Sequence, residues 1–183
     1  MTVKEIIVKA AELLGLSDLV EGYFSSGSED GKKAVDALVG CYNLVESELA
    51  IDYLPLVCED EVKTDTGAVY FTKLRKNASR ILSVCDQNGN AVEWKLFPEY
   101  ILAQAGKLVV RYAYAPTEKN LDDDGEYQSV ASVRLFAYGV AAEYCLIAGL
   151  YEESAVWENK YRAAIQAAYK AKPSKVMKAR RWV

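Results

Sequence analysis

The spacing of apolar residues along this chain changes period twice. From the N-terminus to about Tyr53, apolar residues recur every three or four positions, which is the spacing of one face of an α-helix. Between Leu54 and Pro116 they alternate with polar residues at a period of two, as in a half-buried strand. The helical spacing then returns and continues to about Ala171. Helices before and after a β segment predict a fold of the α+β class.

The pattern before the β segment predicts three helices. The first covers residues 3–15, with its apolar residues on one face and a glycine at its end. A short helix is expected over residues 17–24, capped by the serine and aspartate that begin it. A longer helix is expected over residues 28–53, and its predicted buried stripe consists of Val35, Leu38, Tyr42, Val45 and Leu49.

The period-two segment predicts a small antiparallel β unit. Its alternation predicts strands at residues 57–63, 68–74, 81–85, 91–96 and 107–114. An Asn88-Gly89 step lies between the third and fourth of these strands. Because glycine adopts the positive φ that a tight turn needs, this step predicts a hairpin.

Two further helices are predicted after the β unit. Residues 129–149 are apolar enough for the central helix of a bundle, and Ser129 is expected to cap or closely precede it. A last helix is expected over residues 152–171, before Pro173. The residues of this last helix that are expected to face inward are Trp157, Tyr161, Ala164, Ile165 and Ala168.

The predicted domain organisation follows from these elements. Neither helical half buries its apolar stripe alone, so the two halves are expected to pack on each other. Residues 1–53 and 117–171 should form an antiparallel helical bundle, and residues 54–116 a small antiparallel β insertion. Residues 172–183 remain as a basic C-terminal arm.

The residue types that most often carry chemistry are missing or scattered. The chain has no histidine, which removes Ser–His and Cys–His catalytic pairs and imidazole metal ligands. The cysteines lie too far apart for a zinc or redox motif, so they are interpreted as small buried apolar residues: Cys41, Cys58, Cys85 and Cys145. No Gly-Lys-Ser or Gly-Lys-Thr step of a phosphate loop is present. The sequence therefore predicts a protein that is not an enzyme and needs neither a cofactor nor a metal.

One acidic segment resembles the start of a calcium-binding EF-hand loop. Asn120, Asp122, Asp124 and Gly125 have the right spacing, but Asn replaces the first Asp, and Ala131 stands where a bidentate Glu closes the loop. Adjacent acids in a turn point in different directions, whereas paired-carboxylate catalysis needs acids that converge across a cleft. The segment is therefore interpreted as a solvated turn. A carboxylate-dependent hydrolase remains the third interpretation of the chain.

No membrane or secretion signal is predicted. No apolar run approaches the roughly 20 residues that cross a bilayer. The amphipathic residues 1–5 include an acid where a signal peptide would be apolar. The protein is therefore expected in a reducing cytosol, or in a particle assembled there.

The C-terminal arm is the candidate site for binding a partner. The net charge of the chain is −4, but the last twelve residues hold five bases and no acid, so the other 171 residues carry −9. Such a segment either frays in solvent or docks on a partner, and Arg and Trp are favoured interface residues. The candidate partner-interface residues are Lys175, Met177, Lys178, Arg180, Arg181, Trp182 and Val183.

In the order of its motifs the chain resembles the head-tail connector family of tailed phages, which includes head-completion adaptors and tail tubular A proteins. The N-terminal features that carry the resemblance are a helix like Ile6 to Leu14 and a long helix that runs into Tyr53-x-Pro55. The later features are the strand Leu108-Val109-Val110-Arg111-Tyr112 before Pro116, the alanine-rich helix from Phe136 to Tyr144, Trp157-x-x-x-Tyr161, and Arg180-Arg181-Trp182. The resemblance covers nearly the whole chain.

This resemblance implies a structural virion protein at the head-tail junction. The family's subunits form a homo-oligomeric ring, usually twelvefold, beneath the portal protein. The resemblance implies that the arm reaches the portal, that the β region faces neighbours or tail proteins, and that DNA passes through the lumen without sequence-specific binding. An acidic body suits such a channel, since a negative wall does not hold phosphates. The alternative is a cytosolic helical scaffold or regulatory domain without a virion role.

Overall fold

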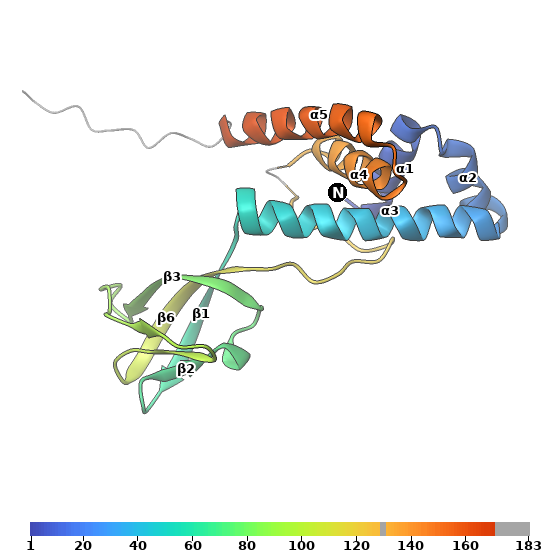
Figure 1. Cartoon of the computed structure of the whole chain (residues 1–183). Helices are drawn as coiled ribbons and strands as arrows, with labels where there is room; N and C mark the ends of the chain where they lie inside the picture. Colours follow the sequence, from blue (N-terminus) through green and yellow to red (C-terminus); the bar gives the residue numbers. More distant parts are fainter. Residues whose placement is uncertain (129–130, 171–183) are drawn as a thin grey trace, which may run out of the picture. The chain divides into compact units, whose positions relative to one another are not determined.

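Five α-helices and two small antiparallel sheets make up the regular structure of residues 1–128 and 131–170, which the computed structural model describes (Figure 1). The expected α+β class is therefore confirmed. The described chain divides into two compact units. The helical unit contains residues 1–42 and the described residues from Tyr127 onward, and the β unit contains residues 43–126, which include the last part of α3.

The N-terminal helix begins and ends as its sequence predicts. Helix α1 covers Val3–Leu14 and starts in a capping box, in which Thr2 and Glu5 each accept a hydrogen bond from the other's backbone N–H. It ends at Gly15, whose φ of 70° is the left-handed conformation that glycine adopts most easily. The expected helix over residues 3–15 is confirmed.

The second helix differs from its prediction at both ends. Helix α2 covers Ser17–Ser26, but the residue at its N-cap is Leu16, and no side chain of the described chain caps its first turn. The expected cap is wrong because Ser17 is already helical, and a cap residue must lie outside the helix. The helix continues past Phe24 because the first residue to leave the helical conformation is Gly27, with φ at 67°.

The long helix α3 covers Glu29–Glu48 and follows the predicted stripe. Ser28 caps it by accepting a hydrogen bond from the Gly31 backbone N–H at 3.1 Å. A Cβ at Gly31 would lie 2.3 Å from the Leu19 carbonyl oxygen, so only glycine lets α2 and α3 approach this closely. The expected stripe residues are all buried: Val35, Leu38, Tyr42, Val45 and Leu49.

A π-helical turn that the sequence did not predict ends this helical stretch at Leu49–Tyr53. In it the Leu54 backbone N–H donates to the Leu49 carbonyl at 2.6 Å. Pro55 follows and has no N–H to continue the helix.

The last two helices pack against each other, and α4 also packs against α1 (Figure 1). Helix α4 covers Val133–Ile147 and helix α5 covers Tyr151–Lys170. The cap of α4 is Ser132, whose hydroxyl accepts from the Leu135 N–H at 3.2 Å, and Ser129 lies outside the described residues. In α5 the two fully buried residues of the predicted inward set are Tyr161 and Ile165, while the others are half-buried: Trp157, Ala164 and Ala168.

Phe136 is the centre of the aromatic core of the helical unit. Its side chain is fully buried, and its ring centroid lies 5.5 Å from that of Tyr42 and 5.9 Å from that of Tyr127. These rings come from α3, α4 and the segment before α4. The core therefore joins chain segments that are far apart in the sequence.

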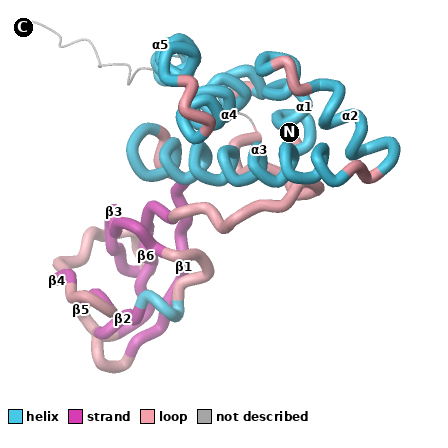
Figure 2. Tube along the Cα trace, turned by 45° about the vertical axis from the view of Figure 1, so that its right-hand side comes forward, coloured by secondary structure: helices cyan, strands magenta, loops and turns pink. Residues whose placement is uncertain are grey.

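The β unit contains two three-stranded sheets (Figure 2). In the larger sheet β6 is central, between β1 and β3, and all pairs are antiparallel: Leu56–Thr64 (β1), Ala78–Asp86 (β3) and Gly106–Tyr114 (β6). In the smaller sheet β5 is central, between β2 and β4: Ala68–Tyr70 (β2), Lys95–Leu96 (β4) and Tyr100–Leu102 (β5).

Two predicted strands are shorter than expected, and one strand was missed. The strand expected at 68–74 ends at Tyr70, because a 3-10 turn at Phe71–Lys73 follows. The strand expected at 91–96 is paired in two short pieces, a single bridge at Ala91 and the short β4. Strand β5 has only three residues, too few for the period-two pattern to identify.

One apolar core joins the two sheets of the β unit. It contains residues of both sheets and of the turn after β2: Val62, Val69, Leu74, Val84, Ile101, Leu108, Val110 and Tyr112. The two ends of the segment lie together, because Leu56 and Tyr114 are paired across β1 and β6. The sheets can therefore form without contributing residues to the core of the helical unit.

This separation of cores gives a prediction for a shortened chain. Replacing residues 56–114 with a short Gly-Ser linker should leave a soluble helical protein, because the linker joins ends that already lie side by side. Circular dichroism should show a cooperative thermal transition with a helical spectrum. Loss of cooperative unfolding would contradict the independence of the two cores.

Candidate functional site

A buried carboxylate, that of Asp60, lies on β1 of the larger sheet. Its side chain is about 5% exposed and accepts hydrogen bonds from the Tyr112 hydroxyl and the Arg75 backbone N–H, both at 2.7 Å. The Arg75 guanidinium donates to its other oxygen at 2.5 Å and also to the Glu59 carbonyl at 2.6 Å. The cluster therefore ties the segment after the 3-10 turn to β1 and β6.

The pKa values in this cluster follow from these contacts. Burial would raise the pKa of Asp60, but the Arg75 backbone N–H, the Tyr112 hydroxyl and the Arg75 guanidinium together hold it below its usual value. Burial and the neighbouring Asp60 raise the pKa of Tyr112. At neutral pH the cluster is an ionised carboxylate whose oxygens are all engaged, which is typical of a structural clamp rather than a general base.

A second polar cluster fixes the segment that follows β6. Glu126 accepts hydrogen bonds from the Lys119 amine and the Tyr114 hydroxyl, both at 3.1 Å, and pairs with Lys76 at 3.6 Å. Its own backbone N–H donates to Glu46 of α3 at 2.8 Å. Burial opposes ionisation of Glu126, yet its bonds to Lys119 and Tyr114 and the nearby Lys76 lower its pKa. The charge of Glu126 is therefore balanced by its ion pairs with Lys76 and Lys119.

In the acidic turn, the Asp123 carboxylate forms a hydrogen bond with the backbone of the same turn. Asp123 accepts a hydrogen bond from the Asn120 N–H at 2.7 Å and donates its own backbone N–H to the Asn120 carbonyl at 3.1 Å. Asp122 and Asp124 are exposed. Within residues 1–128 and 131–170, no three His, Cys, Asp or Glu side chains are grouped so as to hold a metal ion.

Exposed apolar side chains gather where α4 turns into α5. Ile147 and Tyr151 are each 70% exposed, and the neighbouring Leu146 and Leu150 are also exposed. We call these four residues the α4–α5 corner. A smaller exposed apolar set lies on α1 and α2 of the same unit: Val8, Leu19 and Phe24.

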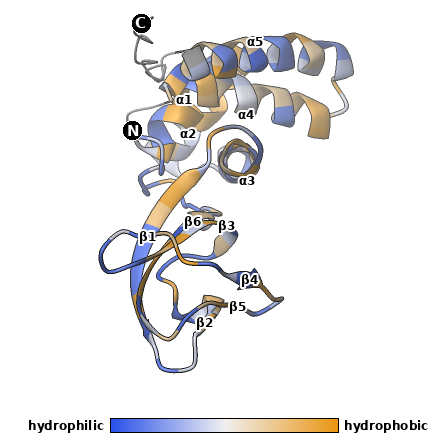
Figure 3. Cartoon of the chain, turned by 90° about the vertical axis from the view of Figure 1, so that its left-hand side faces the viewer, coloured by the Kyte–Doolittle hydropathy of each residue, from blue (hydrophilic) through white to orange (hydrophobic). Residues whose placement is uncertain are grey.

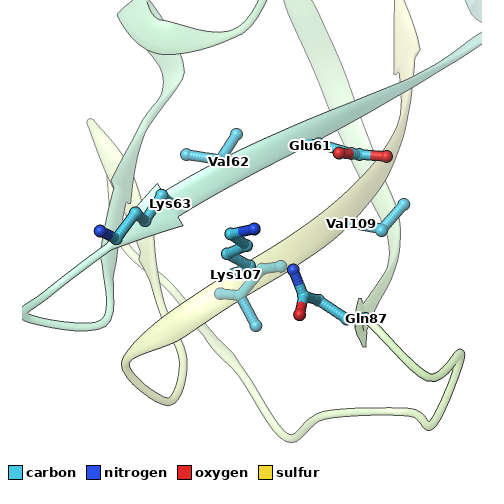
Figure 4. A pocket seen from close by; sticks show the side chains of 7 residues that line it. Glu61, Val62, Lys63, Gln87, Lys107 and Val109 are labelled. Carbon is cyan, nitrogen blue, oxygen red and sulfur yellow. The ribbon is translucent and has the colours of Figure 1, made fainter.

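A shallow polar pocket of about 450 Å³ lies on the β1–β6 face of the larger sheet (Figure 4). Figure 4 shows the Glu61 carboxylate and the Lys63 amine pointing in different directions, with Lys107 beside Gln87. The lining holds one acid, Glu61, and two bases, Lys63 and Lys107, and their charged ends do not converge on one point in this view. The pocket therefore offers no set of groups that would hold a single charged ligand.

An apolar groove of about 760 Å³ lies between the first half of β3 and β4. We call it the β3–β4 groove. Its lining is mainly aromatic and aliphatic: Phe71, Ile81, Trp94, Leu96, Phe97 and Pro98. Beside it, the Phe97 ring stacks on Tyr100 with the centroids 4.8 Å apart.

The predicted partner-interface residues lie outside the described residues: Lys175, Met177, Lys178, Arg180, Arg181, Trp182 and Val183. The sequence does not single out the α4–α5 corner, because Ile147 fits the apolar period of the helix expected over residues 129–149. The apolar run around Gly149 could have indicated this surface, since a solvated turn normally contains polar residues.

None of the helices in the described part of the chain is long and apolar enough to cross a membrane. No protein-family model matches this sequence, and a search of curated proteins finds no match either.

Proposed function

We propose that this chain is a structural subunit of the head-tail junction of a tailed phage. Copies of it form a homo-oligomeric ring, twelvefold on the portal, that joins the portal protein to the tail proteins. Its helices act as an antiparallel bundle that carries the β unit as an insertion. DNA passes through the ring without sequence-specific binding.

The observation that carries this proposal is the exposure of the α4–α5 corner. Ile147 and Tyr151 are each 70% exposed on the single chain. Burying a side chain of this size is worth about 1.5–3 kcal/mol, so leaving both in water is unfavourable unless a neighbour covers them. A contiguous exposed apolar patch is typical of a protein–protein interface.

A ring places a further demand on the subunit. Its interfaces are heterologous, so one surface of a copy must meet a different surface of the next copy. Besides the α4–α5 corner, the helical unit has exposed apolar residues on α1 and α2 (Val8, Leu19 and Phe24) and on α5 (Val156 and Tyr169). This arrangement supports a head-to-tail contact between neighbouring helical units.

Charge and motif order support the same role. Residues 1–171 carry −9, which suits a channel that lets DNA phosphates slide past. The basic arm at 172–183 has the composition of a docking segment, and we propose that it reaches onto the portal. The order of helices, β segment, helices and basic arm is that of the phage connectors the sequence resembles.

The test is attachment to portal-bearing capsids that lack their own connector. The wild-type chain should co-sediment with them, and Ile147→Asp should attach at least about tenfold more weakly, since an unpaired carboxylate would be buried at every interface of the ring. Leu44→Asp is the matched control, because Leu44 is also exposed but lies on α3, outside the α4–α5 corner. Its attachment should equal that of the wild type.

The outcomes separate the candidate functions. If the wild-type chain does not co-sediment, the virion role is wrong and the cytosolic scaffold becomes the better proposal. If Ile147→Asp attaches as well as the wild type, the ring interface does not include the α4–α5 corner. Circular dichroism of both variants should match the wild type, because both replaced side chains lie at the surface.

A further inference from the structure

The Asn88-Gly89 step lies in the turn between the end of β3 and the bridge at Ala91. Apart from the glycine, residues 86–90 are strongly hydrophilic, the property that is coloured blue in Figure 3. Asn88 and Gly89 are both exposed, and a Cβ added at Gly89 would meet nothing within 4 Å beyond its chain neighbours. The Asn88 amide is therefore open to water, and the Gly89 nitrogen beside it is not covered.

A main-chain nitrogen that follows an asparagine can attack the carbon of that residue's side-chain amide. A new C–N bond closes a succinimide ring, the C–N bond to the side-chain nitrogen breaks, and ammonia leaves with the proton of the main-chain nitrogen. Water then adds to either ring carbonyl and reopens the ring as aspartate or isoaspartate. A following glycine favours the attack, because it has no Cβ and its backbone is the least restricted. No other asparagine of the sequence precedes a glycine.

The folded turn holds the attacking nitrogen in place. The Gly89 N–H donates to the Asp86 carbonyl at 3.1 Å, so this hydrogen bond must open before the nitrogen can give up its proton. The Asp86 carboxylate accepts from the Asn88 N–H at 2.8 Å, and from the Asn90 N–H at 2.9 Å and side-chain amide at 3.0 Å. The bonds from Asn90 hold the pKa of Asp86 below its usual value, so this acceptor is ionised at neutral pH. Asp86 therefore fixes the turn on both sides of the reacting step.

We propose that Asn88 is a site of spontaneous deamidation and that the turn built on Asp86 controls its rate. The reaction proceeds in the fraction of molecules whose turn has opened locally. Its product places a second negative charge beside Asp86, and isoaspartate also adds a carbon to the main chain. This longer main chain should weaken the hydrogen bond from Val92 to Val84 that the turn brings together. The reaction and its test are independent of the proposed function.

The test incubates the full-length chain at neutral pH, folded and unfolded in urea, and follows Asn88 by mass spectrometry of proteolytic peptides. The mass change from amide to acid marks deamidation, and chromatographic retention separates aspartate from isoaspartate. Asn88 should convert at least about tenfold more slowly in the folded chain, because only the open fraction reacts. Asn90 is the internal control, since it precedes Ala91 and should convert much more slowly than Asn88 in the unfolded chain.

Variants test the role of Asp86 in the folded chain. Asp86→Ala should speed the conversion of Asn88 about tenfold, because the turn opens more often. Asp65→Ala, which removes an aspartate from another exposed turn of the β unit, should leave the rate unchanged. Asn88→Gln should remove the modification, because the longer side chain would have to close a larger ring.

Three results would overturn the proposal. Asn88 would remain intact in the unfolded chain, convert equally fast in the folded and unfolded chains, or react no faster in Asp86→Ala than in the wild type. The comparison of folded with unfolded wild type decides the case by itself if circular dichroism shows that Asp86→Ala does not fold.

Discussion

Replacing Phe136 with Ala should lower the free energy of unfolding of the helical unit by about 3–5 kcal/mol. The side chain is fully buried between Tyr42 and Tyr127, so its removal leaves a cavity that rigid neighbouring rings fill poorly. Urea denaturation followed by circular dichroism at the helical wavelengths measures the change. This loss is a large fraction of the total stability of a typical domain.

The matched control for this substitution is Phe24→Ala, which removes the same side chain from an exposed site on α2. It should cost less than about 1 kcal/mol, because most surface substitutions have small effects. Equal losses for the two variants would contradict the placement of Phe136 at the centre of the helical core.

Replacing Asp60 with Asn should destabilise the β unit by about 2–3 kcal/mol. The amide replaces one accepting oxygen with a donor, which then faces either the Tyr112 hydroxyl and the Arg75 backbone N–H together or the Arg75 guanidinium. The Arg75 guanidinium is 71% exposed, so its ion pair contributes little, and the loss comes mainly from the buried hydrogen bonds. Near-ultraviolet circular dichroism during urea denaturation follows tertiary structure and should report the transition. Asp65→Asn, in an exposed turn of the same unit, should change stability little.

The same substitution should remove part of the acid sensitivity of the β unit. The pKa of Asp60 is lower in the folded chain than its unfolded value of about 3.9. The ionised form therefore adds stability above about pH 4, and this contribution is lost as the pH falls towards the lowered pKa. Between about pH 6 and about pH 2.5, the stability difference between the wild type and Asp60→Asn should shrink. A difference independent of pH would contradict the lowered pKa.

Sequence patterns predicted the long elements of the fold well. The buried stripe of α3 and the end of α1 at Gly15 are as expected. A long helix shows its apolar period in the sequence, and a glycine marks the position where a positive φ ends a helix. The π-turn at Leu49–Tyr53 and the three-residue β5 leave no such mark. Ser132 was missed as the α4 cap because two serines, Ser129 and Ser132, precede that helix, and the sequence alone does not select between them.

The candidate surfaces could be predicted less well than the fold. Ile147 follows the apolar pattern of α4 and yet is 70% exposed, so the pattern alone does not identify the α4–α5 corner as a surface. The β3–β4 groove lies between strands of the two sheets, and their arrangement follows from sheet order rather than from strand sequences. Local patterns do not contain this information, because it arises from long-range pairing.

The most direct test of the ring proposal is cryo-electron microscopy of portal-bearing capsids mixed with the purified chain. We expect a ring of additional density beneath the portal, with the portal's symmetry and a subunit shape that fits the helical unit. A chain ending at Pro173 lacks all the predicted partner-interface residues, and it should leave the portal bare while its melting temperature stays that of the full chain. Bare portals after mixing with the full-length chain would contradict the proposed function.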